Sequence, residues 1–252
     1  MNGKQRLDGK SIVITGASDG LGRQLAIDFA LQGASRLALV ARRIGRLNEL
    51  RDYIKELAPT CEVTPLQADV SFPTTLEGIA ARVLDVFEGK VDVLVNNAST
   101  LGPSPMPLLV DYPVNEFQRV ISTNLVAPFV LIQKLLPGLM RASGSIINVT
   151  SDAGIHGYPG WGAYGISKFG LEGLSQTWSA ELEDSGVRVN WVDPGSMNTN
   201  MHRLAEPDED PLQWADPADC TEVFVFLASD ESREVNGERF LAQQEADVAM
   251  VS

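Results

Sequence analysis

Short apolar runs rich in valine, isoleucine and leucine alternate along the chain with longer stretches whose apolar residues recur every three or four positions. The short runs predict β-strands, and the longer stretches predict amphipathic helices. We expect strands at residues 10–15, 36–41, 62–68, 91–96, 145–150, 187–192 and 239–241. We expect helices at residues 20–32, 44–57, 74–87, 114–122, 125–140, 164–184 and 216–229.

This alternation of strand and helix is typical of an α/β fold with right-handed crossovers and a parallel sheet. The runs at 91–96 and 145–150 are apolar, as expected for strands buried on both faces. No repeat, low-complexity tract or linker divides the 252 residues. The pattern therefore predicts a single α/β domain over residues 1–252, built on a doubly wound parallel sheet that binds its ligand at the carboxyl ends of the strands.

The net charge narrows the classes of partner. Acidic residues outnumber basic ones by 33 to 20, which gives a formal charge of −13. Nucleic acids and anionic membrane surfaces are bound by clustered lysine and arginine, so neither is expected as a partner. The first ten residues are polar and lack the apolar core of a signal peptide. The apolar run at 125–132, interrupted by Pro128, is far shorter than the roughly 20 residues that span a bilayer.

The cysteine content argues against a disulfide framework and a metal site. Cys61 and Cys220 are the only cysteines, and neither has another cysteine or a histidine at metal-ligand spacing. We expect both to be buried, reduced thiols and the protein to be cytoplasmic.

A glycine-rich turn follows the first expected strand. The segment from Thr15 to Gly22 has the spacing Gly-x-x-x-Gly-x-Gly and leads directly into a helix. Glycines allow close backbone approach to a pyrophosphate, and the helix N-terminus offers unpaired N–H groups. An ordinary strand-to-helix turn is the alternative, but the position between first strand and first helix favours nucleotide binding.

The end of the second strand indicates which dinucleotide is bound. It carries Arg42 and Arg43, and no carboxylate follows before Glu49. A guanidinium can bind the 2′-phosphate of NADP(H), whereas the NAD(H) ribose is usually bound by a carboxylate at this position. We expect NADP(H) rather than NAD(H), with Arg42 as the direct contact. The alternative is a solvated basic helix start, since Arg46 and Arg51 follow.

Tyr164 and Lys168 stand one helical turn apart, and Ser151 ends the strand thirteen residues before Tyr164. A nearby ammonium is expected to lower the phenol pKa, so that Tyr164 could exchange a proton with a carbonyl or alcohol oxygen. Ser151 could hold that oxygen, and Asn124 could anchor a water that connects Lys168 to solvent.

Together these motifs resemble the short-chain dehydrogenase/reductase family, in its branch of single-domain enzymes of roughly 250 residues. The resemblance covers nearly the whole chain and rests on Thr15–Gly22, Asp69-Val70, Asn96-Asn97-Ala98, Asn124, Ser151, Tyr164-x-x-x-Lys168, and Pro194-Gly195 with Thr199. It implies a Rossmann-type, three-layer αβα fold and an oxidoreductase that moves hydride between NADP(H) and a small-molecule carbonyl or alcohol.

The resemblance also implies a role for each matching residue. The implied catalytic set is Tyr164 as acid/base, Lys168 as its neighbour and ribose ligand, Ser151 as substrate ligand and Asn124 as part of a proton relay. The implied cofactor contacts, besides Tyr164 and Lys168, are Gly16, Ser18, Asp19, Gly20, Leu21, Arg42, Arg43, Asp69, Val70, Asn97, Ala98, Pro194, Gly195, Met197 and Thr199. Members often form homodimers or homotetramers through the helices that begin near Leu125 and Tyr164.

Two segments depart from the family pattern. Ser99 stands where glycine usually follows Asn-Asn-Ala, and we expect its small side chain to require a modest adjustment where the cofactor packs. Residues 235–240 differ from the Val-Asp-Gly-Gly-like run that supports subunit contacts in many family members.

Several chemically suggestive residues favour simpler interpretations. His156 follows Ser151, but a Gly-x-Ser-x-Gly elbow is missing, so a serine hydrolase is disfavoured. His202 and the nearby carboxylates lie among prolines, and we interpret residues of about 199–215 as a solvated loop that serves as substrate lid rather than as a metal site. Tyr158 and Trp161 could equally line a pocket or pack beneath the loop.

Other function classes remain as alternatives. A catalytically silent NADP(H) sensor or interaction protein could use the same fold. The complete set of Asn124, Ser151, Tyr164 and Lys168 favours an enzyme instead. An epimerase or dehydratase of the family's longer branch would have another glycine spacing and a larger C-terminal region. No motif identifies the substrate or the direction of the reaction.

Overall fold

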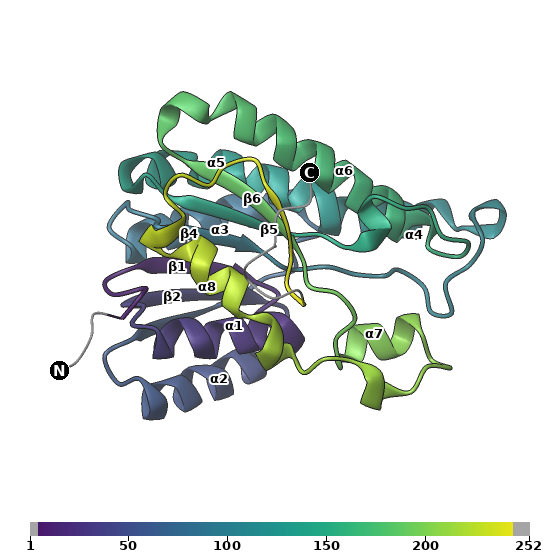
Figure 1. Cartoon of the computed structure of the whole chain (residues 1–252), viewed down its shortest axis with the longest axis horizontal. Helices are drawn as coiled ribbons and strands as arrows, with labels where there is room; N and C mark the ends of the chain where they lie inside the picture. The colour runs from purple at the N-terminus through teal and green to yellow at the C-terminus, as the bar shows by residue number, and fades with distance from the viewer. Residues whose placement is uncertain (1–4, 244–252) are drawn as a thin grey trace.

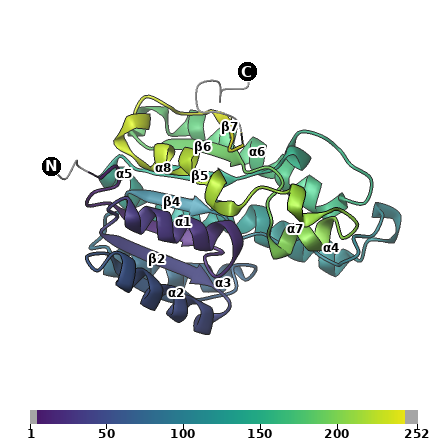
Figure 2. The same ribbon diagram turned by 60° about the horizontal axis from the view of Figure 1, so that its bottom comes forward.

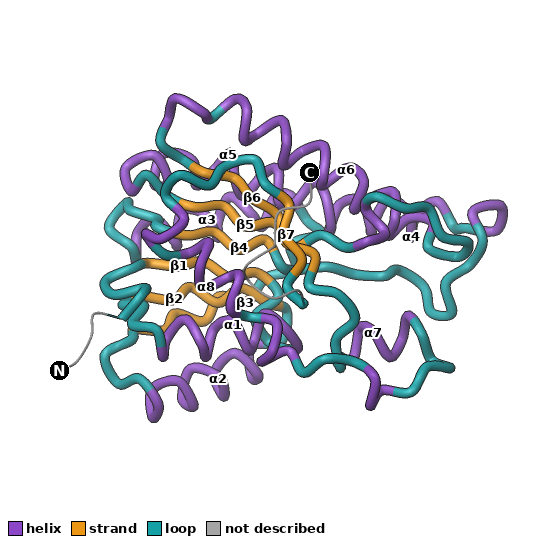
Figure 3. Tube along the Cα trace, in the orientation of Figure 1, coloured by secondary structure: helices purple, strands orange, loops and turns teal. Residues whose placement is uncertain are grey.

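Seven parallel strands form one sheet in the computed structural model, which describes residues 5–243 (Figures 1 and 3). The sheet order is β3-β2-β1-β4-β5-β6-β7. The bounds are β1 Ser11–Thr15, β2 Arg36–Ala41, β3 Glu62–Gln67, β4 Val93–Asn96, β5 Ser145–Val149, β6 Arg188–Asp193 and β7 Arg239–Leu241. All seven predicted strands are present within two residues of their expected ends, and the predicted doubly wound α/β fold is confirmed.

The strand order places a crevice at the centre of the sheet. The chain runs outward from β1 to β3 and then returns across β1 to begin β4, which pairs with the other side of β1. The loops that follow β1 and β4 consequently turn to opposite faces and leave a gap between them. In open α/β sheets this switch point at the carboxyl ends is where ligands bind.

Helices cover both faces of the sheet. The helices α1 (Gly20–Leu31), α2 (Ile44–Leu57) and α8 (Glu222–Ala228) lie on one face, and α3 (Pro73–Val86), α5 (Ala127–Ala142) and α6 (Gly162–Glu181) lie on the other (Figure 1). Successive residues of β1 alternate between two cores, because side chains of a strand point to opposite faces. Ile12 and Ile14 belong to the core under α1, whereas Val13 belongs to the core under α3 and α5.

The two helices expected at 114–122 and 125–140 form one continuous helix. The helix α4 (Val114–Ile121) passes through a single π-helical turn, Ser122–Val126, into α5. Pro128 has no N–H to donate to the carbonyl of residue 124, and the wider turn accommodates this missing bond. The predicted break before Leu125 is therefore wrong, because the chain stays helical there. The position of the predicted break coincides with the π-helical turn that carries Asn124.

The joined helix is long and apolar enough to cross a membrane by length and composition, whereas the apolar run noted in the sequence is not. Its most apolar 18-residue window is 44% buried inside the fold. Leu131, Ile132 and Leu135 belong to the core under α3. Core helices of soluble proteins pass the same test, so this helix is weak evidence for a membrane span.

Two expectations in the C-terminal half need correction. The helix expected at 216–229 is a 3₁₀ turn, Pro217–Cys220, followed by α8, because the Asp216 carboxylate caps the turn by accepting the Ala218 N–H. The lid expected as a loop contains the short helix α7 (Asn200–Ala205), which the Thr199 hydroxyl caps by accepting the His202 N–H at 3.2 Å.

Candidate active site

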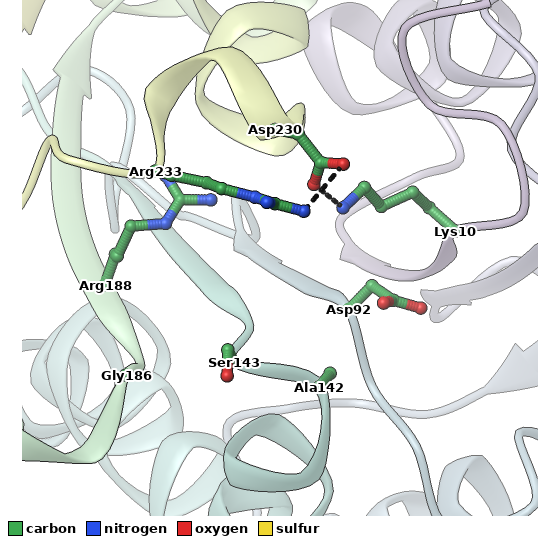
Figure 4. Close-up of a pocket in the computed structure, with 8 residues that line it drawn as sticks. All are labelled: Lys10, Asp92, Ala142, Ser143, Gly186, Arg188, Asp230 and Arg233. Carbon is green, nitrogen blue, oxygen red and sulfur yellow. Dashed lines mark hydrogen bonds and ion pairs between the residues drawn. The ribbon is translucent and has the colours of Figure 1, made fainter.

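Two hollows lie at opposite ends of the sheet. One, of about 430 Å³, lies at the amino-terminal ends of β1, β4 and β6, and its charges are largely paired with one another (Figure 4). Asp230 accepts from Lys10 at 2.7 Å and from Arg233 at 3.0 Å. The other, of about 590 Å³, is a cleft at the carboxyl ends, where the loops after β1 to β6 meet. This cleft lies at the switch point and is the candidate site.

The turn between β1 and α1 forms one wall of the cleft. Gly16 has φ of +69°, and a Cβ atom there would lie 2.8 Å from the Asn97 side chain and 2.9 Å from the Ala98 backbone. The Thr15 hydroxyl accepts the N–H groups of Asn97 and Ala98, both at 3.0 Å. The loops after β1 and β4 are thus fastened to each other, and glycine is required where they touch.

The basic residues after β2 differ in their partners. The Arg43 guanidinium donates to the Asp19 carboxylate at 3.0 Å and to the Ser18 hydroxyl at 3.3 Å. Arg42 also lines the cleft, and its guanidinium forms no ion pair with any residue of 5–243. Burial opposes the ionisation of Asp69, but hydrogen bonds from Ser71 and the charge of Arg42 lower the pKa of that carboxyl overall.

Two features of the cleft suit a bound dinucleotide: the open glycine turn, and one buried polar atom that has no hydrogen-bond partner. The Ser99 hydroxyl oxygen is buried without a hydrogen-bond partner in a residue that lines the cleft. A polar group of this kind is usually satisfied by a ligand or by water. The Ser99 hydroxyl is therefore available to a group bound in the cleft. All residues expected to contact the cofactor line the cleft, as do Ser151, Tyr164 and Lys168.

The helix α6 brings Tyr164 and Lys168 to the centre of the cleft. Both side chains are buried, and the Lys168 ammonium donates to the Val149 carbonyl at 2.8 Å. The ammonium nitrogen lies 5.4 Å from the centre of the Tyr164 ring. Ser151, just beyond β5, donates its hydroxyl proton to Asp152 at 2.8 Å and lies close enough to the phenol to influence its ionisation.

The ionisation of the two central groups differs from the expectation. Burial raises the pKa of the Tyr164 phenol above its usual value, and the neighbouring Ser151 hydroxyl only partly opposes this effect. Burial also lowers the pKa of Lys168 to about 8, although the carboxylates of Asp193 and Glu172 favour its charged form. The expected lowering of the Tyr164 pKa by Lys168 is thus wrong for the protein alone, because desolvation of the phenol dominates.

Asn124 is the one member of the expected catalytic set that does not line the cleft. Its side chain is buried, accepts the Thr100 N–H at 2.9 Å, and donates to the Thr100 carbonyl and the Ser167 hydroxyl, each at 2.9 Å. The amide therefore joins the π-helical turn to the loop after β4 and to α6. Its backbone carbonyl lacks the usual helical donor, because Pro128 has no N–H.

A buried ion-pair network behind Lys168 was not anticipated. Arg239, on β7, donates to Glu172 at 3.1 Å, to Asp193 at 3.0 Å and to the Ser151 carbonyl at 3.3 Å. Thr150 adds a 2.6 Å hydrogen bond to Glu172. The side chains of all three charged residues are at most 11% exposed. The sequence signal for this network was a charged residue at the end of one strand, Asp193, and another at the start of the next, Arg239.

The structure shows the surroundings of His202, Trp161 and Tyr158, the other residues singled out in the sequence. The His202 ring packs edge-on against Trp214 with centroids 4.4 Å apart, and its Nε2 atom lies 3.8 Å from Glu209. Over residues 5–243, no three His, Cys, Asp or Glu side chains are grouped so as to hold a metal ion. Trp161 lines the cleft and packs against Tyr164, whereas Tyr158 is exposed.

Comparisons with known proteins agree with this geometry. The short chain dehydrogenase family model matches residues 10–210. The 3-oxoacyl-[acyl-carrier-protein] reductase FabG of Thermotoga maritima is 35% identical over 243 residues, covering 92% of this chain and 96% of that protein.

Solved structures give the same result. A short chain dehydrogenase from Shigella flexneri matches with a TM-score of 0.90 at 30% identity, covering all of this chain and 98% of its own. A protein from Escherichia coli, solved in complex with NADPH, matches with a TM-score of 0.88 at 32% identity, covering 96% of this chain and 100% of its own. With these matches and the arrangement of its cleft, the chain belongs to the short-chain dehydrogenase family of oxidoreductases.

Proposed function

We propose that the chain is an NADP(H)-dependent oxidoreductase that transfers hydride between the nicotinamide and a carbonyl or alcohol carbon, with Tyr164 as the acid/base. The observation that carries this proposal is the convergence of Tyr164, Lys168 and Ser151 in one cleft with the glycine turn at Gly16 and with Arg42, whose guanidinium forms no ion pair within the described residues 5–243. A purely binding protein has no need of the buried phenol and ammonium.

The bound nicotinamide supplies the hydride chemistry, and the residues of this chain manage the oxygen and its proton. Ser151 Oγ holds the substrate oxygen beside Tyr164 Oη. The phenol donates its proton to that oxygen during reduction, and solvent then restores the proton. Because burial raises its pKa, Tyr164 is protonated at neutral pH, which is the form that reduction needs. Lys168 lies beside the ring and favours the phenolate that forms.

A nucleotide titration of the purified protein tests the proposal. We expect NADPH to bind tightly and NADH weakly, measured by quenching of intrinsic fluorescence and by nucleotide fluorescence. NADPH bound by the E. coli relative supports the same preference. Binding of neither nucleotide would overturn the oxidoreductase, and NADPH binding without turnover of any carbonyl would favour the silent sensor instead.

Substitution of Arg42 should change the cofactor preference. We expect Arg42→Asp to weaken NADPH binding about 10- to 100-fold, because a hydrogen bond to a charged group is worth about 1.5–3 kcal/mol, and the new carboxylate repels the 2′-phosphate. NADH binding should hold or improve. Arg51→Asp makes the same charge change on α2 outside the cleft and should leave both affinities within about twofold. Unchanged selectivity in Arg42→Asp would move the 2′-phosphate site elsewhere.

We also propose a cytoplasmic homo-oligomer. The outer surfaces of α5 and α6 carry the exposed apolar side chains of Phe129, Met140, Ile166 and Phe169, which supports association through these helices.

The expectation of buried free cysteines is confirmed, and burial raises the thiol pKa to about 12 at Cys61 and about 11 at Cys220. Unreactive thiols of this kind suit a reducing compartment.

A further inference from the structure

We propose that the substrate is an uncharged, largely apolar carbonyl compound rather than an anionic thioester or a sugar phosphate. This inference rests on the proposed function and specifies what the same cleft accepts. It follows from three features of the end of the cleft beyond Tyr164: its lining, its enclosure and its charges.

The lining includes an apolar cluster. Leu101, Ala153 and Tyr164 form a separate buried cluster at this end, against which Met106, Trp161, Met201 and Ala205 pack. The Trp161 and Tyr164 rings meet edge-on with centroids 5.5 Å apart. Besides Ser151 and Tyr164, which would bind the reacting oxygen, the polar residues Ser104, Asp152, Asn200 and His202 share this lining with the apolar cluster. A hydrophobic site of this kind binds apolar groups by removing their surface from water.

The walls of this end come from two segments that touch each other. The loop after β4 runs from residue 98 to α4, and the Ser104 hydroxyl donates to the Leu204 carbonyl of α7 at 3.3 Å. The helices α4 and α7 lie at the same end of the molecule in Figures 1 and 2. Leu109 of the loop after β4 also approaches Gly162 at the start of α6. The reacting carbonyl would thus be held between apolar walls.

The charges around this end disfavour an anion. The three enclosing segments, residues 98–113, 151–161 and 194–215, contain six carboxylates and a single arginine. That arginine, Arg203, donates to the Asn198 side chain at 2.5 Å. The six carboxylates are Asp111, Asp152, Glu206, Asp208, Glu209 and Asp210. Arg203 does not line the cleft, so an anionic group would meet net repulsion on approach and no cation from these segments within the cleft.

The cations of the cleft lie elsewhere. Arg42 and Arg43 follow β2 at the cofactor end, and Arg119 pairs with Glu116 at 3.1 Å and acts on Asp69 at that same end. Lys168 is buried beneath Tyr164 and bonded to the Val149 carbonyl. The positive charge is thus distributed to suit the phosphates of NADP(H) and not those of a second ligand. The similarity to FabG therefore does not extend to a thioester whose carrier arm bears a phosphate.

A matched pair of thioesters tests the proposal on the whole protein with NADPH. The N-acetylcysteamine and coenzyme A thioesters of 3-oxohexanoic acid share one reacting group, but only the second carries phosphates. A neutral aromatic diketone, 1-phenylpropane-1,2-dione, is the third substrate. From the rate of NADPH oxidation we expect kcat/KM for the neutral thioester to exceed that for the coenzyme A thioester by at least about tenfold at low salt. Added salt should narrow the ratio.

A substitution inside the apolar end gives a second readout. Met201→Lys places an ammonium there and should lower kcat/KM for the diketone while raising the relative rate on the coenzyme A thioester. Leu212→Lys makes the same kind of change at a fully exposed lid position outside the cleft and should leave the ratio of the two thioesters unchanged.

The outcomes separate this inference from the function on which it rests. Preference for the neutral thioester or turnover of the diketone alone supports the inference. Preference for the coenzyme A thioester overturns it and leaves the oxidoreductase intact. If NADPH binds and none of the three compounds is reduced, the proposed function and the inference fall together.

Discussion

Tyr164→Phe is expected to lower kcat by about 10²–10⁴-fold, the usual contribution of a positioned acid/base, while NADPH binding stays within a few-fold. The substitution removes the only proton donor proposed for the substrate oxygen and keeps the ring that packs against Trp161 at 5.5 Å. The phenol is buried, so water cannot readily take its place. Steady-state kinetics on a reducible carbonyl and the nucleotide titration measure the two quantities separately.

The control is Tyr53→Phe, which removes a tyrosine hydroxyl from the exposed surface of α2, outside the cleft. It should leave both kcat and NADPH binding unchanged. Turnover by Tyr164→Phe at the rate of the unaltered protein would contradict the mechanism. If the variant loses both NADPH binding and turnover, Tyr164 has a structural role instead.

The strands and the cleft were predictable because local sequence determines them. Apolar β-branched runs of strand length have few alternatives in a chain of this composition, and the loops after them must meet at one edge of a parallel sheet. The glycine spacing from Gly16 to Gly22 and the pair Tyr164 and Lys168 are short-range patterns as well. Their placement in one cleft followed from the predicted topology.

Features that depend on packing between distant segments were not predictable in the same way. The continuity of α4 with α5 depends on how the helix satisfies its backbone around Pro128. The raised pKa of Tyr164 depends on desolvation by neighbours far away in sequence, of which a residue spacing gives no measure. The role of Asn124 likewise became apparent only once its amide was found bonded to Thr100 and Ser167.

The position of Arg239 connects the divergent C-terminal segment with the reacting groups. Its guanidinium lies between Glu172 on α6 and Asp193 on β6, and it also holds the carbonyl of Ser151. Both carboxylates act on Lys168, and that of Asp193 also acts on Tyr164. Arg239 is therefore a positioning residue, which acts on the site through the carboxylates that it neutralises.

Arg239→Met is expected to lower the free energy of unfolding by about 3–5 kcal/mol, because it leaves two buried carboxylates without their cation. Arg239→Lys should cost less, since a lysine restores the charge but not the paired geometry. Urea unfolding measures both. The matched control is Arg233→Met, which breaks an exposed ion pair with Asp230 and should cost no more than about 1 kcal/mol.

Arg239→Met should also shift the pH dependence of kcat/KM for reduction. In the unaltered protein Lys168, with a pKa of about 8, loses its charge as the pH rises through that value, so kcat/KM should fall there. Without Arg239 the carboxylates of Asp193 and Glu172 act on Lys168 and Tyr164 less opposed, and a less opposed negative charge raises the pKa of both groups. The alkaline limb of the Arg239→Met profile should therefore lie at higher pH than that of the unaltered protein, with Arg239→Lys between them. A loss of stability with an unmoved limb would show that Arg239 holds the fold together without tuning the site.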